Sequence, residues 1–333
     1  MKLKPLRDQV VVVLGASSGI GRQIALDLGE HGAKVVVAAR SEEGLASLVD
    51  EIDTRGGRGT YVVCDVVDPM DVERVAEAAI LTFGRIDTWV NVAAVTVYAR
   101  FEDTTPEEFR RVMEVNYLGQ VHGALSALPR LRANGGGAFI SVSSVESSVA
   151  LPLTSAYAAS KHAFEGALQA LRRELIAEGA PISITSVKPA TINTPLFNNA
   201  RTKLGVKPKG PPPIYHPGVV ADCVLYAAQH PVRDLYAGGA ARMMTVAQTI
   251  APGFVDRMLA RFGIESQRTT EPPVDQGRGN LEAPRVEEGR AEGDYEQQAR
   301  RFSLYTWMET HPAARLLAAG GLLASSAMLW SRR

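Results

Sequence analysis

The sequence is poor in cysteine and has no excess of either charge, and both absences narrow what the protein can be. Its 333 residues include 2 Cys, and 36 Lys and Arg balance 36 Asp and Glu. Two cysteines cannot form a disulfide framework, so we expect a reducing, cytoplasmic compartment. A net charge of zero argues against a protein that binds nucleic acid through bulk electrostatics.

Signals for secretion and for metal binding are also missing. Charged residues occur within the first nine positions, and the apolar run at residues 10–14 is too short for the hydrophobic region of a signal peptide. The 6 His residues show no ligand spacing. We therefore expect neither a secretory leader nor a metal site.

What the chain does have is a regular alternation of apolar, β-branched runs with helical patterns. Hydrophobic residues make up 46% and charged residues 22%, which is typical of a globular protein. The predicted strands lie at residues 10–14, 34–39, 60–64, 87–92, 137–142 and 181–187, with a short last one at 233–239. Strands that alternate with helices need crossover connections, which predicts an α/β fold with a doubly wound, Rossmann-like parallel sheet.

The C-terminal part departs from this pattern. Residues 265–294 hold few apolar side chains, three prolines and four glycines, so we expect this stretch to be extended or disordered. The run from Leu316 to Trp330 contains no charged residue. We therefore divide the chain into a folded domain at residues 1–262, a polar, partly disordered extension at 263–310 and an apolar C-terminal helix at 311–333.

A glycine-rich turn joins the first predicted strand to the first predicted helix. Glycines permit a tight turn and a close approach of the backbone to a ligand, and the N–H groups at a helix N-terminus favour anions. The strand–turn–helix context predicts a nucleotide site whose phosphates contact the turn. The residues of this site are Gly15, Ser17, Ser18, Gly19, Ile20 and Gly21.

The ends of the next two strands bear on which nucleotide is bound. Where an NAD-specific site usually carries an acid, this chain has Arg40. A guanidinium can pair with the 2′-phosphate of NADP, so we expect NADP(H) in preference to NAD(H); the alternative is an ordinary solvated arginine. Asp65, followed by Val66, is interpreted as an adenine contact, with helix capping as its alternative role.

Three polar residues predict acid–base chemistry beside that nucleotide. Tyr157 and Lys161 lie four residues apart on a predicted helix and so share a face. A nearby cation favours the phenolate, so we expect a lowered Tyr157 pKa and a pair that exchanges a proton with an alcohol or ketone oxygen. Ser144 ends a strand 13 residues earlier and can hydrogen-bond the same oxygen.

Over about two thirds of its length the chain resembles the short-chain dehydrogenase/reductases. The resemblance rests on the glycine turn and on Asn91-Val-Ala-Ala94, Asn116-Tyr-Leu-Gly119, Ser143-Ser144, Tyr157-Ala-Ala-Ser-Lys161 and Pro189-Ala-Thr-Ile192-Asn-Thr194. It implies a catalytic tetrad of Asn116, Ser144, Tyr157 and Lys161, in which Asn116 holds a water of a proton relay. It also implies cofactor contacts at Asn91, Ala93, Tyr157, Lys161, Pro189, Ile192 and Thr194.

The chain departs from the family pattern at two places near the expected cofactor. The family's Asn-Asn-Ala-Gly stands here as Asn91-Val-Ala-Ala94, and its Pro-Gly as Pro189-Ala190. The resemblance also places a substrate lid at residues 198–217, whose lysines we interpret as solvated. An apolar pocket lined by Tyr98, Leu196, Phe197 and Tyr215 would suit a hydrophobic carbonyl or alcohol substrate.

The apolar run from Leu316 to Trp330 allows three interpretations. As a helix its 15 residues would span about 22 Å, against a hydrocarbon core of about 30 Å. It can be a tail anchor, a helix that lies on a membrane, or a helix that docks on another subunit. We also expect a homo-oligomer.

These patterns together predict an NADP-dependent oxidoreductase with residues 1–262 as its NADP-binding domain. It would transfer a hydride between the nicotinamide and the carbonyl or secondary alcohol of an apolar small molecule. The alternative is a catalytically silent nucleotide-binding scaffold, attached to a membrane or a partner through its C-terminal helix.

Overall fold

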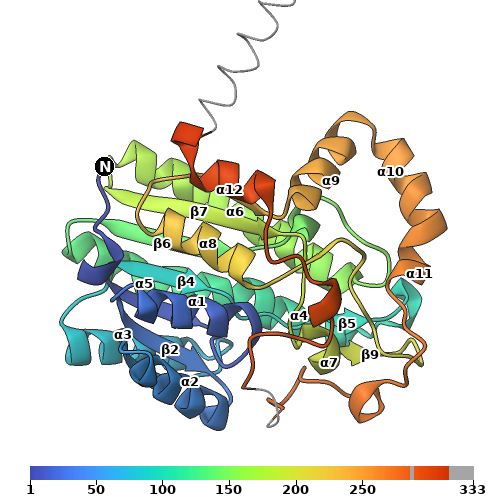
Figure 1. The fold of residues 1–333 in the computed structure, drawn as a ribbon, viewed down its shortest axis with the longest axis horizontal. Helices are drawn as coiled ribbons and strands as arrows, with labels where there is room; N and C mark the ends of the chain where they lie inside the picture. Colours follow the sequence, from blue (N-terminus) through green and yellow to red (C-terminus); the bar gives the residue numbers. More distant parts are fainter. Residues whose placement is uncertain (286–288, 315–333) are drawn as a thin grey trace, which may run out of the picture.

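A seven-stranded parallel sheet forms the centre of the computed structural model, which describes residues 1–285 and 289–314 (Figure 1). Its strands are β1 (Val10–Leu14), β2 (Lys34–Ala39), β3 (Arg58–Val63), β4 (Thr88–Asn91), β6 (Gly137–Val142), β7 (Ile182–Pro189) and β11 (Asp234–Ala237). Their order across the sheet is β11-β7-β6-β4-β1-β2-β3. The predicted doubly wound α/β fold is confirmed.

Helices cover both faces of this sheet (Figure 1). One face packs on α1 (Gly19–Glu30), α2 (Glu42–Thr54) and α8 (Gly218–Ala227), and the other on α3 (Pro69–Phe83), α4 (Pro106–Met113), α5 (Gly119–Ala133) and α6 (Ser155–Ala177). Side chains of β1 alternate between the two cores, with Val11 and Val13 in one and Val12 and Leu14 in the other. Burial on both faces explains why these strands are continuous apolar runs.

The chain reverses its direction of travel across the sheet between β1 and β4. Strands β1, β2 and β3 follow one another outward on one side, while β4, β6, β7 and β11 follow on the other. In doubly wound folds a ligand cleft lies at such a switch point, beyond the carboxyl ends of the strands. Gly15 ends β1 there with a φ of 87°, and a Cβ on it would lie 2.5 Å from the Ala93 nitrogen, so only glycine fits.

Shorter elements surround the carboxyl ends of the strands. They are β5 (Val97–Tyr98), β8 (Thr191–Ile192), α7 (Leu196–Asn199), β9 (Arg201–Thr202), β10 (Ile214–Tyr215) and the 3₁₀ turn η4 (Val145–Ser147). Asn116 lies in a π-helical turn (Glu114–Leu118) that joins α4 to α5. Such turns interrupt the regular hydrogen-bond ladder of a helix and are frequent at functional sites.

Further helices follow β11. They are α9 (Gly239–Ile250), α10 (Pro252–Met258) and α11 (Ile264–Ser266), and α10 begins at Pro252 directly after the end of α9. Later in the chain come a 3₁₀ turn (Glu296–Gln298) and α12 (Leu304–Thr310). Ser303 begins α12 by accepting a hydrogen bond from the Thr306 N–H.

The described part of the extension lies against the domain in an extended path (Figure 1, orange to red). Leu281 is fully buried in the same core as α3 and α5. The run from Leu316 to Trp330, and most of the helix predicted at residues 311–333, lies outside the described residues. No helix within residues 1–285 and 289–314 is long and apolar enough to cross a membrane.

Candidate active site

A cleft at the switch point brings together most of the residues predicted to bind a nucleotide. The predicted residues that line it are Gly15, Ser17, Ser18, Gly19, Ile20, Gly21, Arg40, Asp65, Val66, Ala93, Tyr157, Lys161 and Thr194. Asn91 is not part of its lining. The buried Asn91 amide instead accepts the Trp89 indole N–H at 2.8 Å and donates to the Gln120 carbonyl at 3.0 Å, which fixes the end of β4.

Tyr157 and Lys161 line this cleft, and Ser144 lies beside it in a hydrogen bond with Tyr157. Ser144 follows β6, and its Oγ accepts the Glu146 N–H at 3.0 Å. That bond uses a lone pair of Oγ and leaves the hydroxyl proton of Ser144 for its hydrogen bond with Tyr157. Lys161 is buried on α6, donates to the Val142 carbonyl at 3.2 Å and lies 5.4 Å from the centre of the Tyr157 ring.

Asn116 connects the loop after β4 to the catalytic helix. Its Oδ1 accepts the Val95 N–H at 2.8 Å, and its Nδ2 donates to the Val95 carbonyl at 2.9 Å and to Ser160 Oγ at 3.0 Å. Ser160 precedes Lys161 on α6. The fully buried amide therefore positions α6 against the edge of the nucleotide cleft.

Burial decides the charge states at this site. Desolvation raises the pKa of Tyr157 above its ordinary value, the negative charge of Glu146 adds to the rise, and a hydrogen bond with Ser144 opposes it. The expected lowering of the Tyr157 pKa is therefore not found, because the cost of desolvating the phenolate is the largest effect on it. Burial also lowers the pKa of Lys161 to about 8. A phenol that keeps its proton at neutral pH can donate it to a carbonyl oxygen.

A second pocket opens beside Ser144 and Tyr157. Its lining includes the predicted residues Ser144, Tyr157, Pro189, Ile192 and Thr194, together with the apolar Tyr98, Leu196 and Phe197. Tyr215 does not line this pocket. Its ring packs against Gly238, and a Cβ added to Gly238 would lie 2.6 Å from Tyr215 Cε2. The pocket lies where a molecule can touch both Ser144 and Tyr157, as the substrate of this site must.

Sequence reasoning missed Glu146 in that pocket. Its carboxylate accepts the Thr154 hydroxyl at 2.7 Å, and burial raises the pKa of Glu146 to about 7. Thr96 also lines the pocket, and its buried hydroxyl has no hydrogen-bond partner among the described residues. The position of Glu146 two residues after Ser144 is the sequence feature that could have indicated its place in this site.

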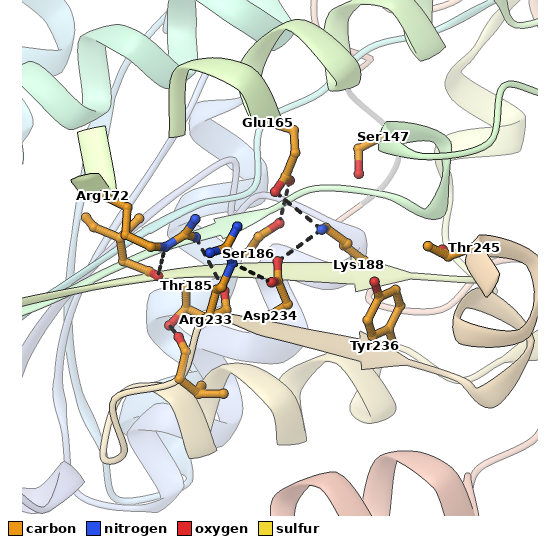
Figure 2. A network of polar contacts seen from close by, with 12 residues as sticks. Ser147, Glu165, Arg172, Thr185, Ser186, Lys188, Arg233, Asp234, Tyr236 and Thr245 are labelled. Carbon is orange, nitrogen blue, oxygen red and sulfur yellow. Dashed lines mark hydrogen bonds and ion pairs between the residues drawn. The ribbon is translucent and has the colours of Figure 1, made fainter. Parts of the chain in front are cut away.

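A second polar network lies farther along α6 (Figure 2). Lys188 on β7 pairs with Glu165 on α6 at 3.3 Å and with Asp234 on β11 at 3.0 Å. Glu165 also accepts the Ser186 hydroxyl at 2.9 Å. The network ties the catalytic helix to two strands and so supports the site from outside the cleft.

The remaining predictions concern single charges. Asp65 lines the cleft but pairs with Arg111 at 3.2 Å, and its Oδ1 accepts the Val67 N–H. Lys207 is not solvated as predicted: it is buried and pairs with Asp294 of the extension at 2.6 Å. Within the part of the chain that the structure describes, no three His, Cys, Asp or Glu residues are grouped to hold a metal ion.

Three comparisons place this architecture among known proteins. The family model of the short chain dehydrogenases matches residues 9–205. The uncharacterized oxidoreductase YxnA of Bacillus subtilis (strain 168) is 40% identical over 274 residues, which are 82% of this chain and 77% of that protein. Dehydrogenase/reductase SDR family member 7B of Bos taurus is 33% identical over 266 residues, 77% of this chain and 81% of that protein.

The matched region includes β1 with its glycine turn, the strand end that carries Ser144, and the Tyr157–Lys161 face of α6. It therefore covers the reactive side chains and the lining of the cleft, except for Asn280, Pro284 and Arg285. The chain belongs to the short-chain dehydrogenase/reductase family, whose members are oxidoreductases that act on carbonyl or alcohol groups with a nicotinamide dinucleotide.

Proposed function

We propose that this protein transfers a hydride between NADP(H) and the carbonyl or secondary-alcohol carbon of an apolar small molecule. The observation that carries the proposal is the place of Tyr157, which lines both the nucleotide cleft and the second pocket. A group reduced or oxidised by the cofactor must lie at that junction. Asn116, Ser144, Tyr157 and Lys161 are the residues to which we assign the reaction.

The residues of the cleft fit such a dinucleotide. Gly15 and Gly19 have positive φ angles, and a Cβ on Gly19 would lie 3.3 Å from Thr194 Cβ, so side chains there would narrow the cleft. Ser18 stands at the N-cap of the 12-residue α1 without a side-chain capping bond among the described residues. Apart from the Gly19 N–H, which donates to the Arg290 carbonyl, the amides of that helix end can therefore face phosphates.

The protein's part in the reaction is to hold the substrate oxygen and to move a proton. The nicotinamide ring supplies or accepts the hydride. In the reductive direction Tyr157 donates its hydroxyl proton to the carbonyl oxygen, and the Ser144 hydroxyl hydrogen-bonds that oxygen while its negative charge develops. The cationic form of Lys161 favours the phenolate that remains. Oxidation of an alcohol runs the same steps backward.

Support for NADP(H) over NAD(H) comes from the surroundings of Arg40. Its guanidinium donates to the carbonyls of Asn280 at 2.7 Å and Glu282 at 3.2 Å. Neutral acceptors orient the group without neutralising it, so its charge is available to a 2′-phosphate. The nearby Asp65 pairs with Arg111 instead.

An Arg40→Asp variant tests the cofactor preference. We expect the ratio of the NADPH to the NADH dissociation constant to rise at least about tenfold, because a carboxylate repels the 2′-phosphate. Arg132→Asp is the matched control, since Arg132 pairs with the exposed Glu178 on another surface. If Arg40→Asp leaves the ratio unchanged, the preference does not come from this residue.

The reaction itself is tested by following NADPH absorbance with a panel of carbonyl compounds. Because Tyr98, Leu196 and Phe197 line the second pocket, kcat/KM should increase with the apolar area of the substrate. Binding of NADPH without turnover of any carbonyl would favour the nucleotide-binding scaffold instead.

The C-terminal tail and the oligomeric state stay predictions, as does the division at residues 262 and 310. Membrane contact through the run from Leu316 to Trp330 rests on its sequence, LLAAGGLLASSAMLW. Deleting residues 316–333 and fractionating cells tests it: a full-length protein found wholly in the soluble fraction contradicts membrane contact. Light scattering of the purified chain tests the homo-oligomer.

A further inference from the structure

The C-terminal extension forms one wall of the nucleotide cleft. Asn280, Pro284 and Arg285 line the cleft together with the glycine turn and Arg40. These residues lie more than 200 positions after the turn, beyond the region that the family model matches. We call residues 280–285 the cleft strap.

The cleft strap is bound to the domain at several points. The Asn280 N–H donates to the Asn199 carbonyl at 2.7 Å, and Arg111 donates to the Leu281 carbonyl at 3.1 Å. Leu281 between these bonds is fully buried. The strap is therefore a fixed part of the cleft rather than a loose segment beside it.

The chain stays attached beyond the strap. The Gly19 N–H of the glycine turn donates to the Arg290 carbonyl at 2.9 Å, and Asp294 accepts from Lys207 at 2.6 Å and from Asn198 at 2.8 Å. These contacts lower the pKa of Asp294 well below its ordinary value despite partial burial. The described residues before and after 286–288 are thus both attached to the domain.

The position of Arg285 suits the middle of a dinucleotide. Its Nη1 donates to the Asn198 carbonyl on α7 at 3.1 Å. This helix follows Thr194, the residue that approaches Gly19 of the glycine turn, so Arg285 is tied to the part of the cleft beside that turn. A guanidinium is the side chain best suited to pair with phosphate oxygens.

Two amides in the same region are left without partners. Asn199 and Asn280 both line the cleft, and the Oδ1 atom of each is buried without a hydrogen-bond donor among the described residues. Buried acceptors are normally satisfied, so an unpaired one at a ligand cleft indicates a donor that the ligand brings. The ribose hydroxyls and the adenine amino group of a dinucleotide are such donors.

We propose that the cleft strap is a cofactor-binding element of this enzyme, in which Arg285 binds the diphosphate of the dinucleotide and the Asn280 amide accepts a hydrogen bond from its adenosine half. The inference rests on the proposed function for the identity of the ligand. It adds to the cofactor site the cleft strap and the Arg285 guanidinium, neither of which belongs to the family's motifs.

The first test compares Arg285→Gln with Arg278→Gln. Arg278 is an exposed arginine of the same extension that pairs with Asp275 and does not line the cleft. Because NADPH and NADH share the diphosphate, we expect Arg285→Gln to weaken both about tenfold, without changing their ratio. Arg278→Gln should leave both dissociation constants unchanged. Equal dissociation constants in Arg285→Gln and wild type, or a loss for NADPH alone, would overturn the diphosphate assignment.

The second test needs no substituted residue and no turnover. Full-length protein is digested with trypsin with and without saturating NADPH, and cleavage after Arg278, Arg285 and Arg290 is followed by mass spectrometry. Bound NADPH should slow cleavage after Arg285 and Arg290 at least about fivefold, since a ligand that binds the folded site stabilises it. Unchanged cleavage rates contradict the proposal.

The two proposals fail in different ways. If no carbonyl is reduced but NADPH protects the strap, the proposed reaction fails and the cleft strap stands. If carbonyls are reduced but neither the Arg285→Gln affinities nor the cleavage rates change, the strap proposal fails and the reaction stands.

Discussion

Two buried lysines lie near the catalytic helix, and their surroundings are opposite. Lys161 donates to one backbone carbonyl, and burial lowers its pKa to about 8. Lys188 lies between Glu165 and Asp234; burial acts against its charge, but the two carboxylates together raise the pKa of Lys188 above its ordinary value (Figure 2). The protein thus stabilises the cation that supports the fold and leaves the cation at the reactive site poorly stabilised.

The comparison teaches that stability and reactivity are separated along one helix. The ammonium group of Lys188 is paired with two carboxylates, so it holds α6 to the sheet and is not free to bind a ligand. A charge without a carboxylate partner costs stability but can respond to a proton transfer beside it. Substitutions at Tyr157 and Lys161, and in the network of Lys188 that contacts α6 through Glu165, should therefore have different consequences.

The largest expected effect is on turnover, at Tyr157. Tyr157→Phe removes the hydroxyl that carries the proton, so kcat should fall by about 10²- to 10⁴-fold. The melting temperature and the NADPH dissociation constant should stay close to wild type, because the ring is retained. Stopped-flow and steady-state NADPH absorbance give the rates. A variant that keeps more than a tenth of the wild-type kcat would remove Tyr157 from the mechanism.

The next effect is on stability, at Lys188 on β7. Lys188→Met leaves Glu165 and Asp234 without their shared cation, which should lower the free energy of unfolding by about 3 kcal/mol. Urea titration measures the loss, and kcat of the folded protein should be retained.

The matched control for that variant is the double substitution Glu165→Gln/Lys188→Met. It removes one of the stranded carboxylates, so it should be less destabilised than Lys188→Met alone. If the losses of unfolding free energy in Glu165→Gln and in Lys188→Met add up to the loss in the double variant, the pair does not act as a unit.

At Lys161 we expect a smaller change in the free energy of unfolding, opposite in sign to that of Lys188→Met. Lys161→Met should abolish most turnover, yet raise the free energy of unfolding at pH 7, because it removes a cation that burial disfavours. Between pH 8 and 10.5 the unfolded wild-type chain holds the Lys161 proton more tightly than the folded one. Wild-type stability should therefore rise with pH relative to the variant through this window. Parallel pH–stability curves for the two proteins would contradict the lowered pKa.

The smallest expected effect concerns Glu146. Its pKa of about 7 lies near neutrality, and its negative charge raises the pKa values of both Tyr157 and Lys161. Glu146→Gln should remove an ionisation near pH 7 from the pH profile of kcat/KM and change kcat itself by only a few-fold. The profile is measured with NADPH and the best carbonyl of the panel. An inflection near pH 7 that persists in the variant would assign it to another group.

Local patterns in the sequence were sufficient to predict the sheet, the glycine turn and the shared face of Tyr157 and Lys161, because each of these features depends on residues a few positions apart. The extension shows where such patterns fail. Its low apolar content suggested that it could not pack, yet Leu281 and the pair formed by Asp294 with Lys207, 87 residues away, attach it to the domain. Contacts of that separation leave no periodic signal.

The direction of the Tyr157 pKa shift could not be predicted for a related reason. The spacing of Tyr157 and Lys161 shows that they share a face, but it carries no measure of how much water each loses on folding. The cost of that loss is the largest effect on the Tyr157 pKa, and the negative charge of Glu146 adds to it. Glu146 lies in the 3₁₀ turn after β6, and a turn of this kind has no periodic pattern that would predict it from the sequence.

The contact between Gly19 and Arg290 also has a consequence for the order in which the protein is made. A ribosome adds about 5 to 20 residues per second, so residue 290 follows residue 19 by roughly 14 to 54 s. During synthesis the glycine turn and the first strands therefore exist for many seconds before the wall that faces them. The lining of the nucleotide cleft thus begins with Gly15 and is completed only when Arg285 has been added.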